Sequence, residues 1–240
     1  MRKDYLYEKE FIQIQIICDF DGTVTPVDTT DAILSHFAPP QWETIENEWL
    51  AGKINAHECM RRQIALLKIN KGRLNNFLEK IVLTRGFASF VNYAKCKKID
   101  VAVVSDGLDY VINYLLMRYL IHGLPVIANK LNVDRQGCSL EFPYKKAGCG
   151  QGVCKCAVAK SYGAKKIILI GDGRSDFCLA EQADFVLAKA GASLESHCHE
   201  LSIPYATYDD FYDVIEFFDS ISMVIETGYS ENEIYSRLIS

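Results

Sequence analysis

Four short polar signals in this chain each adjoin an apolar segment, and their residue types suit the chemistry of a phosphoryl group. They are Asp19 with Asp21, Ser105, Lys155, and Asp172 with Asp176. Carboxylates that converge repel one another unless a cation lies among them. A hard, oxygen-rich site with an open side suits Mg²⁺, which keeps a substrate phosphate in its shell. A lysine and a serine hydroxyl would hold the remaining phosphate oxygens, so the pattern predicts a site for phosphoryl transfer.

Two of these carboxylates can be given separate roles. An aspartate such as Asp19 can attack phosphorus and form an aspartyl-phosphate, which divides hydrolysis into two easier steps. Asp21 can protonate the leaving alkoxide and later deprotonate water. Each signal alone has an ordinary explanation, because Asp-Gly sequences form turns and serine caps helices. Their joint occurrence at the ends of apolar segments favours catalysis.

The apolar segments predict a parallel sheet that would bring these signals together. Strands are expected at 11–18, 100–105, 125–133, 166–170, 184–187 and 204–207, with a hairpin return at 139–142. Helices between them are expected at 109–120, 153–162 and 175–182 and in the tail from Asp209. Strands that alternate with helices indicate a doubly wound, Rossmann-like α/β fold, whose ligands bind beyond the carboxyl ends of the strands.

A purely helical block interrupts this alternation after the first strand. Helices are expected at 29–37, 41–50, 55–68 and 74–83. A block of this length is too long for an ordinary loop, so it predicts an inserted, all-helical cap. We therefore expect a core domain formed by residues 1–26 and 87–240 and a cap domain formed by residues 27–86.

Composition narrows the class of protein. The 240 residues are 49% hydrophobic and 24% charged, and 26 Lys and Arg against 31 Asp and Glu give a net charge of −5. We expect no nucleic-acid partner, because no basic patch stands out. No apolar run approaches the roughly 20 residues of a membrane span. The nine cysteines are odd in number and no export signal is visible, so we expect reduced thiols and a cytoplasmic protein.

At the four signals the sequence resembles the haloacid dehalogenase superfamily. The residues that carry the resemblance are Asp19-Phe20-Asp21-Gly22-Thr23, Ser105, Lys155 and Gly171-Asp172-Gly173-Arg174-Ser175-Asp176. The resemblance implies that Asp19 is the nucleophile, that Asp21 is the acid and base, and that Ser105 and Lys155 bind phosphate. It also implies Mg²⁺ held by Asp19, the carbonyl of Asp21 and Asp172, with Asp176 in support.

Within the superfamily the chain resembles the phosphoserine-phosphatase-like group, and most closely its methionine-salvage phosphatases. The stretches Gly52-Lys53-Ile54-Asn55, Glu181-Gln182-Ala183-Asp184 and Tyr208-Asp209-Asp210-Phe211 carry this likeness. The expected substrate contacts are Phe20, Asp106 and Gly107 beside the motifs, and Asp28, Arg61, Arg62 and Gln63 in the cap. Gln63 stands where phosphoserine phosphatases have an arginine. A glutamine cannot form that bidentate pair with a carboxylate, which disfavours phosphoserine.

Several alternatives stay open at this point. The same motifs would serve hydrolysis of a small phosphorylated metabolite, phosphoryl transfer to another alcohol, or a non-catalytic phosphometabolite sensor. Sugar phosphates, phosphocholine-like esters and methylthio-ketose phosphates are all compatible, and the sequence does not fix the oligomeric state. Cys138, Cys149, Cys154 and Cys156 could hold Zn²⁺, but their spacing lacks the usual short knuckle, which favours free thiols.

Overall fold

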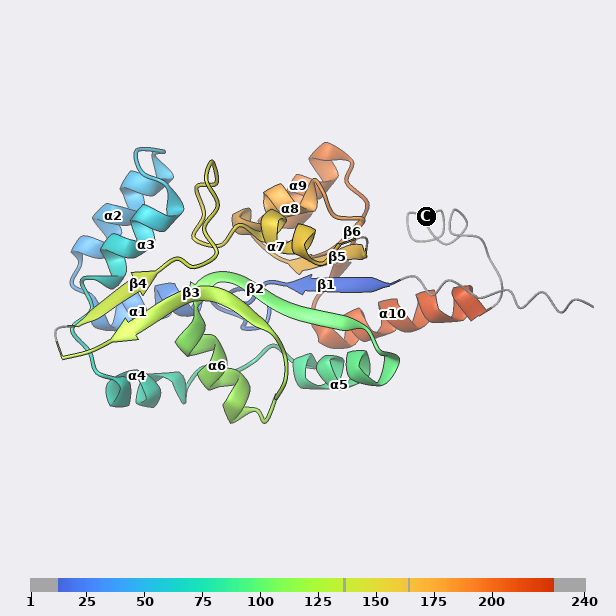
Figure 1. Ribbon diagram of the computed structural model, residues 1–240, viewed down its shortest axis with the longest axis horizontal. Coiled ribbons are helices and arrows are strands. Elements are labelled where there is room, and N and C mark those ends of the chain that lie inside the picture. The colour runs from blue at the N-terminus through green and yellow to red at the C-terminus, as the bar shows by residue number, and fades with distance from the viewer. Residues whose placement is uncertain (1–12, 136, 164, 227–240) are drawn as a thin grey trace, which may run out of the picture.

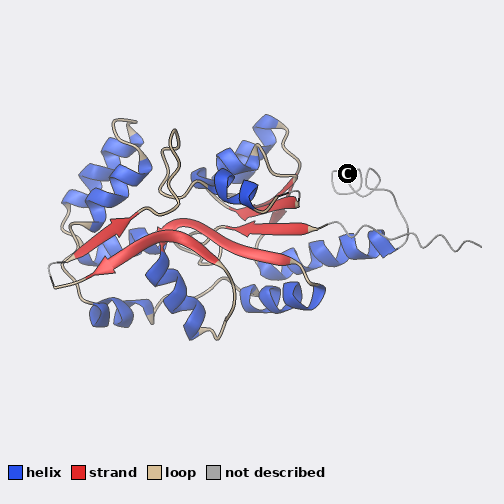
Figure 2. Ribbon diagram, in the orientation of Figure 1, coloured by secondary structure: helices blue, strands red, loops and turns tan. Residues whose placement is uncertain are grey.

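The computed structural model describes residues 13–135, 137–163 and 165–226. A seven-stranded sheet runs through this part of the chain in the order β4-β3-β2-β1-β5-β6-β7 (Figures 1 and 2). Every neighbouring pair is parallel except β3 and β4. The strands are β1 (Ile14–Cys18), β2 (Asp100–Leu108), β3 (Val126–Val133), β4 (Cys138–Glu141), β5 (Lys166–Gly171), β6 (Phe185–Lys189) and β7 (Tyr205–Tyr208).

Helices cover both faces of the sheet. Those of the core are α5 (Phe87–Lys97), α6 (Asp109–Arg118), α7 (Lys155–Ser161), α8 (Phe177–Ala180), α9 (Ser193–Leu201) and α10 (Phe211–Glu226), with a 3-10 turn η1 (Arg174–Asp176) before α8. In Figure 1, α5, α6 and α10 lie below the sheet, and α7, α8 and α9 lie above it. The predicted doubly wound α/β fold is confirmed. No helix in the described residues is long and apolar enough to cross a membrane.

Alternation along β1 divides the core into two apolar clusters. Ile16 and Cys18 belong to the cluster that includes Phe90 of α5, whereas Ile17 belongs to the cluster that includes Leu194 of α9. Successive side chains of a strand point to opposite faces, so an uninterrupted apolar strand must be covered on both sides. Residues 11 and 12 of the predicted first strand lie outside the described residues, as does the tail beyond residue 226.

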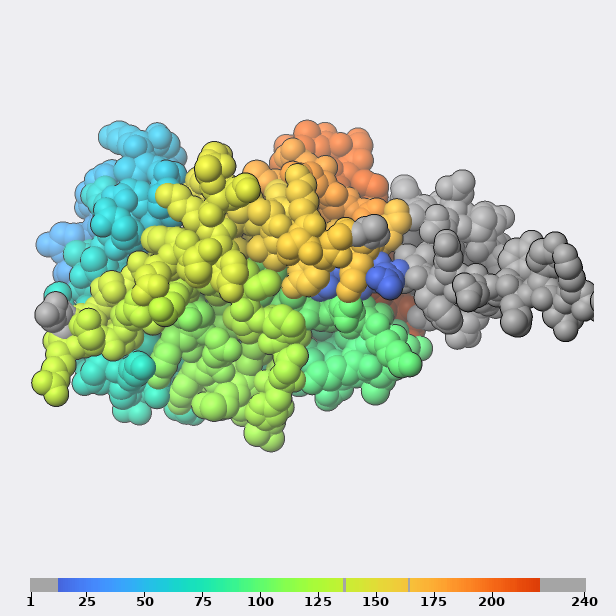
Figure 3. Space-filling view, in the orientation of Figure 1, coloured from blue at the N-terminus to red at the C-terminus, as the bar shows by residue number. Residues whose placement is uncertain are grey.

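The helical insertion follows β1, as predicted. It consists of α1 (Thr29–Phe37), α2 (Gln41–Leu50), α3 (Ala56–Ile64) and α4 (Lys71–Leu78). In Figures 1 and 3, α2 and α3 stand beside β4 and the loop that follows it, and His57 N donates to Gly150 O at 3.2 Å. The first apolar cluster includes both insertion residues such as Ile64 and Leu74 and core residues such as Phe90. The proposed domain limits stay a prediction.

Two helices of the insertion end earlier than predicted, and α5 was not predicted. The helix expected to reach Lys68 ends at Ile64, because Leu66 N and Leu67 N bond three residues back, to Gln63 O and Ile64 O, and the turn tightens. The helix expected over 74–83 begins at Lys71 and ends at Leu78. The side chain of Asn70 caps its start by accepting a hydrogen bond from Arg73 N.

Candidate active site

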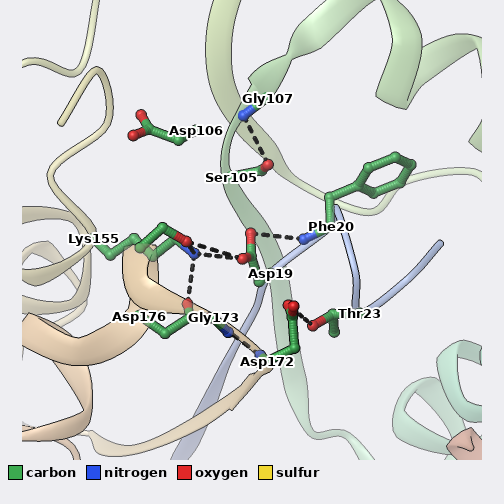
Figure 4. Close-up of polar contacts among 12 residues, drawn as sticks. Asp19, Phe20, Thr23, Ser105, Asp106, Gly107, Lys155, Asp172, Gly173 and Asp176 are labelled. Carbon is green, nitrogen blue, oxygen red and sulfur yellow. Dashed lines mark hydrogen bonds and ion pairs between the residues drawn. The ribbon is translucent and has the colours of Figure 1, made fainter. Parts of the chain in front are cut away.

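The sheet order brings three of the four polar signals to one edge. β1 lies between β2 and β5, so Asp19 and Asp172, just beyond the ends of β1 and β5, are neighbours of Ser105. Ser105 lies within β2, which continues to Leu108 rather than ending at residue 105 as predicted. Lys155 is the first residue of α7, and its side chain reaches into the same place. Figure 4 shows these side chains pointing toward one another. The convergence predicted from the sequence is therefore what the fold produces.

Asp19 lies at the centre of a dense polar network. It is only 4% exposed, and one carboxylate oxygen accepts a hydrogen bond from Phe20 N at 2.8 Å. The other oxygen lies 2.9 Å from Lys155 Nζ and accepts a hydrogen bond from Ser175 Oγ at 3.2 Å. Because both oxygens are held, the carboxylate has one fixed orientation, as a nucleophile requires.

Lys155 is a buried cation between two carboxylates. Its Nζ also lies 2.5 Å from Asp176 Oδ1, and both side chains are almost fully buried. Burial lowers the pKa of Lys155, but the negative charges of Asp176 and Asp19 outweigh it, so the pKa is raised above its ordinary value. The ammonium therefore stays charged at neutral pH and is available to a phosphate oxygen.

Asp19, Asp172 and Asp176 form an acidic trio. Each offers an oxygen within 4.8 Å of the others, and within the described residues this is the single His, Cys, Asp or Glu group arranged for a metal ion. Burial, and then the charge of Asp19, raises the pKa of Asp172 to about 6 and that of Asp176 to about 7. When all three are ionised, the trio carries more negative charge than Lys155 alone balances, and a divalent cation fits it.

Two glycines allow the trio to pack this closely. A Cβ atom on Gly22 would lie 2.3 Å from Asp172 Oδ2, and one on Gly171 would lie 2.4 Å from Asp176 Oδ2. Gly22 also has a φ of +78°, a conformation that side chains disfavour. The glycines beside the aspartates are thus required by close approach as well as by the turn.

Asp21 lies outside the trio and is held separately. Its carboxylate accepts hydrogen bonds from Thr29 N at 2.7 Å and Thr29 Oγ1 at 2.5 Å. Burial, followed by the nearby charge of Asp28, raises its pKa well above the ordinary value. A raised pKa favours the protonated form of the carboxyl group, which is the form that can protonate a leaving group.

Ser105 and Gly107 lie beside Asp21 on an irregular part of β2. The pairing register with β3 shifts between Val104 and Leu108, and Ser105 Oγ accepts a hydrogen bond from Gly107 N at 2.9 Å. A Cβ atom on Gly107 would lie 2.3 Å from Asp21 Oδ2, so the missing side chain makes room for the acid. Asp106 points instead toward the segment before α7, where its carboxylate accepts a hydrogen bond from Val153 N at 2.7 Å.

A cavity of about 320 Å³ joins this network to the insertion. On the core side it is lined by Asp19, Asp21, Ser105, Asp106, Gly107, Gln151, Asp172, Gly173, Arg174 and Ser175. On the insertion side it is lined by Asp28, Thr30, Asp31, Glu46, Trp49, Ala56, Cys59, Met60 and Gln63. A second hollow of about 370 Å³ lies by the amino ends of β1 and β2, beside Gln15 and Asp100, away from these groups.

Three predicted substrate contacts do not line the cavity. The Phe20 ring is fully buried in the first apolar cluster and points away from the Asp19 carboxylate in Figure 4. Arg61 pairs with Glu58 at 2.6 Å and Arg62 with Glu48 at 2.5 Å. The structure therefore brings Asp28, Gln63, Asp106 and Gly107 to the cavity, and not these three side chains.

Other cavity residues were not predicted as site residues. Ser175 lies within the motif that also holds Asp172 and Asp176, so its position next to them was a usable signal. Asp31, Glu46 and Trp49 belong to no motif, and only the packing of the insertion places them. Of the cysteines considered for zinc, Cys138 is buried in β4, Cys149 lies in the loop before α7, and Cys154 and Cys156 lie at the start of α7.

Strand ends of a doubly wound sheet carry a buried acidic trio and a carboxyl group with a raised pKa, and a charged lysine at the start of a helix reaches them. This arrangement is that of a phosphoryl-transfer site of the aspartate-nucleophile type. The model of the haloacid dehalogenase-like hydrolase family matches residues 16–181, and the chain belongs to this family. The prediction of a haloacid dehalogenase-type phosphoric monoester hydrolase is confirmed.

Curated relatives match nearly the whole chain. A 2-hydroxy-3-keto-5-methylthiopentenyl-1-phosphate phosphatase of Geobacillus kaustophilus is 32% identical over 222 residues, which are 89% of this chain and 99% of that protein. A protein of the same name from Brevibacillus brevis is 28% identical over 222 residues, 89% of this chain and 98% of its own length. The predicted resemblance to methionine-salvage phosphatases is confirmed.

Solved structures share the fold. A phosphoserine phosphatase described as a phospho-aspartyl intermediate analogue superposes with a TM-score of 0.65 at 21% identity, covering 86% of this chain and 99% of its own. A probable phosphoserine phosphatase from Vibrio cholerae gives a TM-score of 0.67 at 14% identity, and the match covers 91% of this chain and 68% of that one. At these identities the likeness concerns the fold.

Proposed function

We propose that this protein is a Mg²⁺-dependent phosphatase that hydrolyses a small phosphorylated metabolite through an aspartyl-phosphate on Asp19. The observation that carries the proposal is the placement of Asp19, whose carboxylate contacts Lys155 and Ser175 and opens onto the cavity. The relatives' names, which are those of phosphatases, support the same reaction. We also propose that residues 27–86 act as the cap domain and that the protein works in the cytoplasm.

The first half-reaction would join Asp19 to phosphorus. A carboxylate oxygen of Asp19 attacks the phosphorus atom, and the bond from phosphorus to the ester oxygen breaks. The Asp21 carboxyl group, whose protonated form is favoured by burial, gives its proton to the departing alkoxide. The alcohol then leaves, and Asp21 remains as a carboxylate.

The second half-reaction would release phosphate. Asp21 removes a proton from a water molecule, and the water oxygen attacks the phosphorus atom of the aspartyl-phosphate. The bond to the Asp19 oxygen breaks, which restores the Asp19 carboxylate and the proton on Asp21. Thr29, which donates twice to Asp21, keeps that carboxyl group in place through both steps.

Charge compensation falls to Lys155, Ser105 and a metal ion. Lys155 and the Ser105 hydroxyl would bind phosphate oxygens. Asp19, the carbonyl of Asp21 and Asp172 would hold Mg²⁺, with Asp176 fixed behind them by Lys155. When bound, the ion neutralises the charge of the transferring group and so acts as a Lewis acid. The acidic trio is the observation that favours this ion.

The test is Mg²⁺-dependent phosphate release from p-nitrophenyl phosphate and a panel of small phosphate monoesters. Asp19→Asn should lower kcat by at least about a thousandfold, since removal of a nucleophile costs this much or more. The matched control is Asp209→Asn, the same chemical change at an exposed aspartate outside the cavity. Full activity in Asp19→Asn would contradict the assignment. Preferential capture of the phosphoryl group by an added alcohol would replace the hydrolase with a phosphotransferase.

A further inference from the structure

The insertion side of the cavity carries three carboxylates. Asp28 precedes α1, Asp31 lies in its first turn, and Glu46 lies on α2, and all three line the cavity. The Asp28 side chain accepts a hydrogen bond from Asp31 N at 2.9 Å. The Glu46 carboxylate accepts a hydrogen bond at 2.8 Å from Nε2 of the neutral Gln63 side chain. None of the three has a cationic partner among the residues that the structure describes.

The charges of these carboxylates disturb one another. Partial burial, and then the negative charges of Asp28 and Glu46, raises the pKa of Asp31 to about 6. Burial also raises the pKa of Asp28. Negative charge that is concentrated without compensation favours a cation in the space between the groups. Arg174, the one cationic side chain that lines the cavity in the described chain, extends from the core side to the Trp49 ring and forms no ion pair with Asp28, Asp31 or Glu46.

A buried hydroxyl group independently indicates a ligand on this side. Thr30 lies between Asp28 and Asp31, lines the cavity and is 7% exposed, and its Oγ1 has no hydrogen-bond partner. Buried polar groups are almost always hydrogen-bonded, because an unmade bond costs about 1–3 kcal/mol. A ligand that offers a hydrogen bond would satisfy this atom.

An aromatic ring completes the wall. The guanidinium carbon of Arg174 lies 5.6 Å from the centre of the Trp49 ring, so this ring already attracts a cation in the structure. Ammonium groups bind well where an aromatic face and carboxylates meet. A substrate carboxylate, by contrast, would face Asp28, Asp31 and Glu46, because Arg61 and Arg62 lie outside the cavity.

We propose that the natural substrate is the phosphate ester of a small amino alcohol without a carboxylate, and that its ammonium group binds among Asp28, Asp31, Glu46 and Trp49. This inference rests on the proposed phosphatase function and narrows its substrate class. The phosphate would bind at Lys155 and the ammonium group at the opposite wall, so the two charges of the substrate match the two walls of the cavity. The substrate named for the curated relatives contains no amino group in its name, so this chain would differ from them.

The test compares cationic esters with neutral esters of the same shape. Phosphocholine is paired with 3,3-dimethylbutyl phosphate, and phosphoethanolamine with propyl phosphate, so each pair differs in the charged nitrogen. With Mg²⁺ present, kcat/KM should favour the cationic member of at least one pair by about tenfold or more, since several partly solvated charge contacts act together. The pair with the larger ratio shows whether the ammonium is quaternary or primary.

Variants locate the effect. Asp31→Asn and Glu46→Gln should each reduce the ratio between cationic and neutral esters by about threefold or more. Glu43→Gln, an exposed carboxylate on the same helix α2 but outside the cavity, should leave the ratio unchanged. Inhibition of p-nitrophenyl phosphate hydrolysis by choline or ethanolamine, compared with 3,3-dimethylbutanol or propanol, gives the same comparison without turnover of the ester.

The outcomes separate the two proposals. Equal or faster turnover of the neutral esters, or a ratio that neither variant changes, would overturn the amino-alcohol proposal while p-nitrophenyl phosphate hydrolysis leaves the phosphatase standing. If p-nitrophenyl phosphate and every other ester are inert with Mg²⁺, the phosphatase proposal fails and the amino-alcohol proposal fails with it.

Discussion

The two walls of the cavity are built in opposite ways. On the core side, Asp19, Lys155 and Asp176 are buried, and each charge has partners within 3.2 Å. On the insertion side, Asp28 and Asp31 are carboxylates without a cationic partner among the described residues, and Thr30 Oγ1 is buried without a hydrogen bond. The core wall therefore holds its catalytic groups in place through contacts within the protein, whereas the proposed substrate would supply the missing partners of the insertion wall.

This difference assigns separate tasks to the two walls. A fixed, desolvated network stabilises charge that develops on a transferring phosphoryl group, because its dipoles need no reorganisation. A wall whose charges are unbalanced selects the ligand that balances them. Substitutions in the core wall should thus lower turnover for every ester, and substitutions in the insertion wall should change which ester is preferred.

The largest expected effect comes from the acid and base of the core wall. Asp21→Asn should lower kcat by about a hundredfold to ten-thousandfold, the usual contribution of general acid–base catalysis. Because the leaving group and the attacking water both need Asp21, activated esters such as p-nitrophenyl phosphate should lose less in the first half-reaction than alkyl esters. Burst kinetics with both ester types measures this, and an equal loss for both in the first half-reaction would contradict the acid role.

Loss of the buried cation should destabilise the core wall. Lys155→Met leaves Asp19 and Asp176 without their partner, and removal of one member of a buried ion pair costs about 3–5 kcal/mol. Urea unfolding of the metal-free protein gives the free energy of unfolding. The matched control is Lys165→Met, whose partner Asp100 is exposed, and it should cost about 1 kcal/mol or less. Similar losses for the two variants would show that the core wall is not a tightly coupled network.

The acidic trio gives the metal-free protein a defined pH dependence. The folded-state pKa is about 6 for Asp172 and about 7 for Asp176, above the ordinary value of about 3.9 for an unfolded aspartate. The folded state therefore binds more protons between roughly pH 4 and 7, and the stability that these two groups confer at low pH is lost as the pH rises through 6 to 7. Mg²⁺ binds the ionised form, so it should stabilise the protein more at pH 8 than at pH 5.

Urea unfolding at pH 5 and pH 8, with Mg²⁺ and with chelator, measures this dependence. In Asp172→Asn, the free energy of unfolding should differ less between the two pH values. Mg²⁺ should also increase that free energy by less than in the unmodified protein. A gain from Mg²⁺ that is equal at both pH values, or larger at pH 5, would contradict a metal site made of these carboxylates.

The smallest expected effect comes from the insertion wall. It is a change with pH in the ratio of kcat/KM for a cationic ester to kcat/KM for its neutral isostere. The pKa of Asp31 is about 6, so its carboxyl group is neutral below this pH and negative above it. The preference for a cationic ester over its neutral isostere should therefore rise between pH 5 and 7.5 by a few-fold. Each ratio is taken at one pH, so pH effects on the shared catalytic groups cancel. Asp31→Asn should flatten the rise, and a rise that persists unchanged in this variant would contradict its assignment to Asp31.

The same contrast explains what the sequence could predict. The core wall is made of residues in short motifs at strand ends, and a parallel sheet brings strand ends together whatever their separation in sequence. Asp19 and Asp172 could be recognised for this reason, and Ser105 and Lys155 because they lie in the strand and at the start of the helix that flank the same place. The helices that pack on the sheet were less predictable, since α5 carries no motif and α3 ends where its last turn tightens.

The insertion wall depends on helix rotation, which residue types alone do not determine. On α3, Cys59, Met60 and Gln63 lie within one turn of one another and share the face that lines the cavity. Arg61 and Arg62 lie one and two residues beyond Met60, which rotates them away from that face toward Glu58 and Glu48. Asp31 and Glu46 reach the cavity only through the way α1 and α2 pack, a tertiary relationship that no short pattern records.

The most direct test of the central claim is to trap the phosphorylated enzyme. Asp21→Asn protein would be mixed with p-nitrophenyl phosphate and Mg²⁺ and quenched in acid, and its peptides would be analysed by mass spectrometry. The proposed mechanism predicts the mass of one phosphoryl group on the peptide that contains Asp19, and none in the Asp19→Asn, Asp21→Asn double variant. A phosphoryl group on another residue, or release of p-nitrophenol with no labelled peptide at any quench time, would contradict Asp19 as the nucleophile.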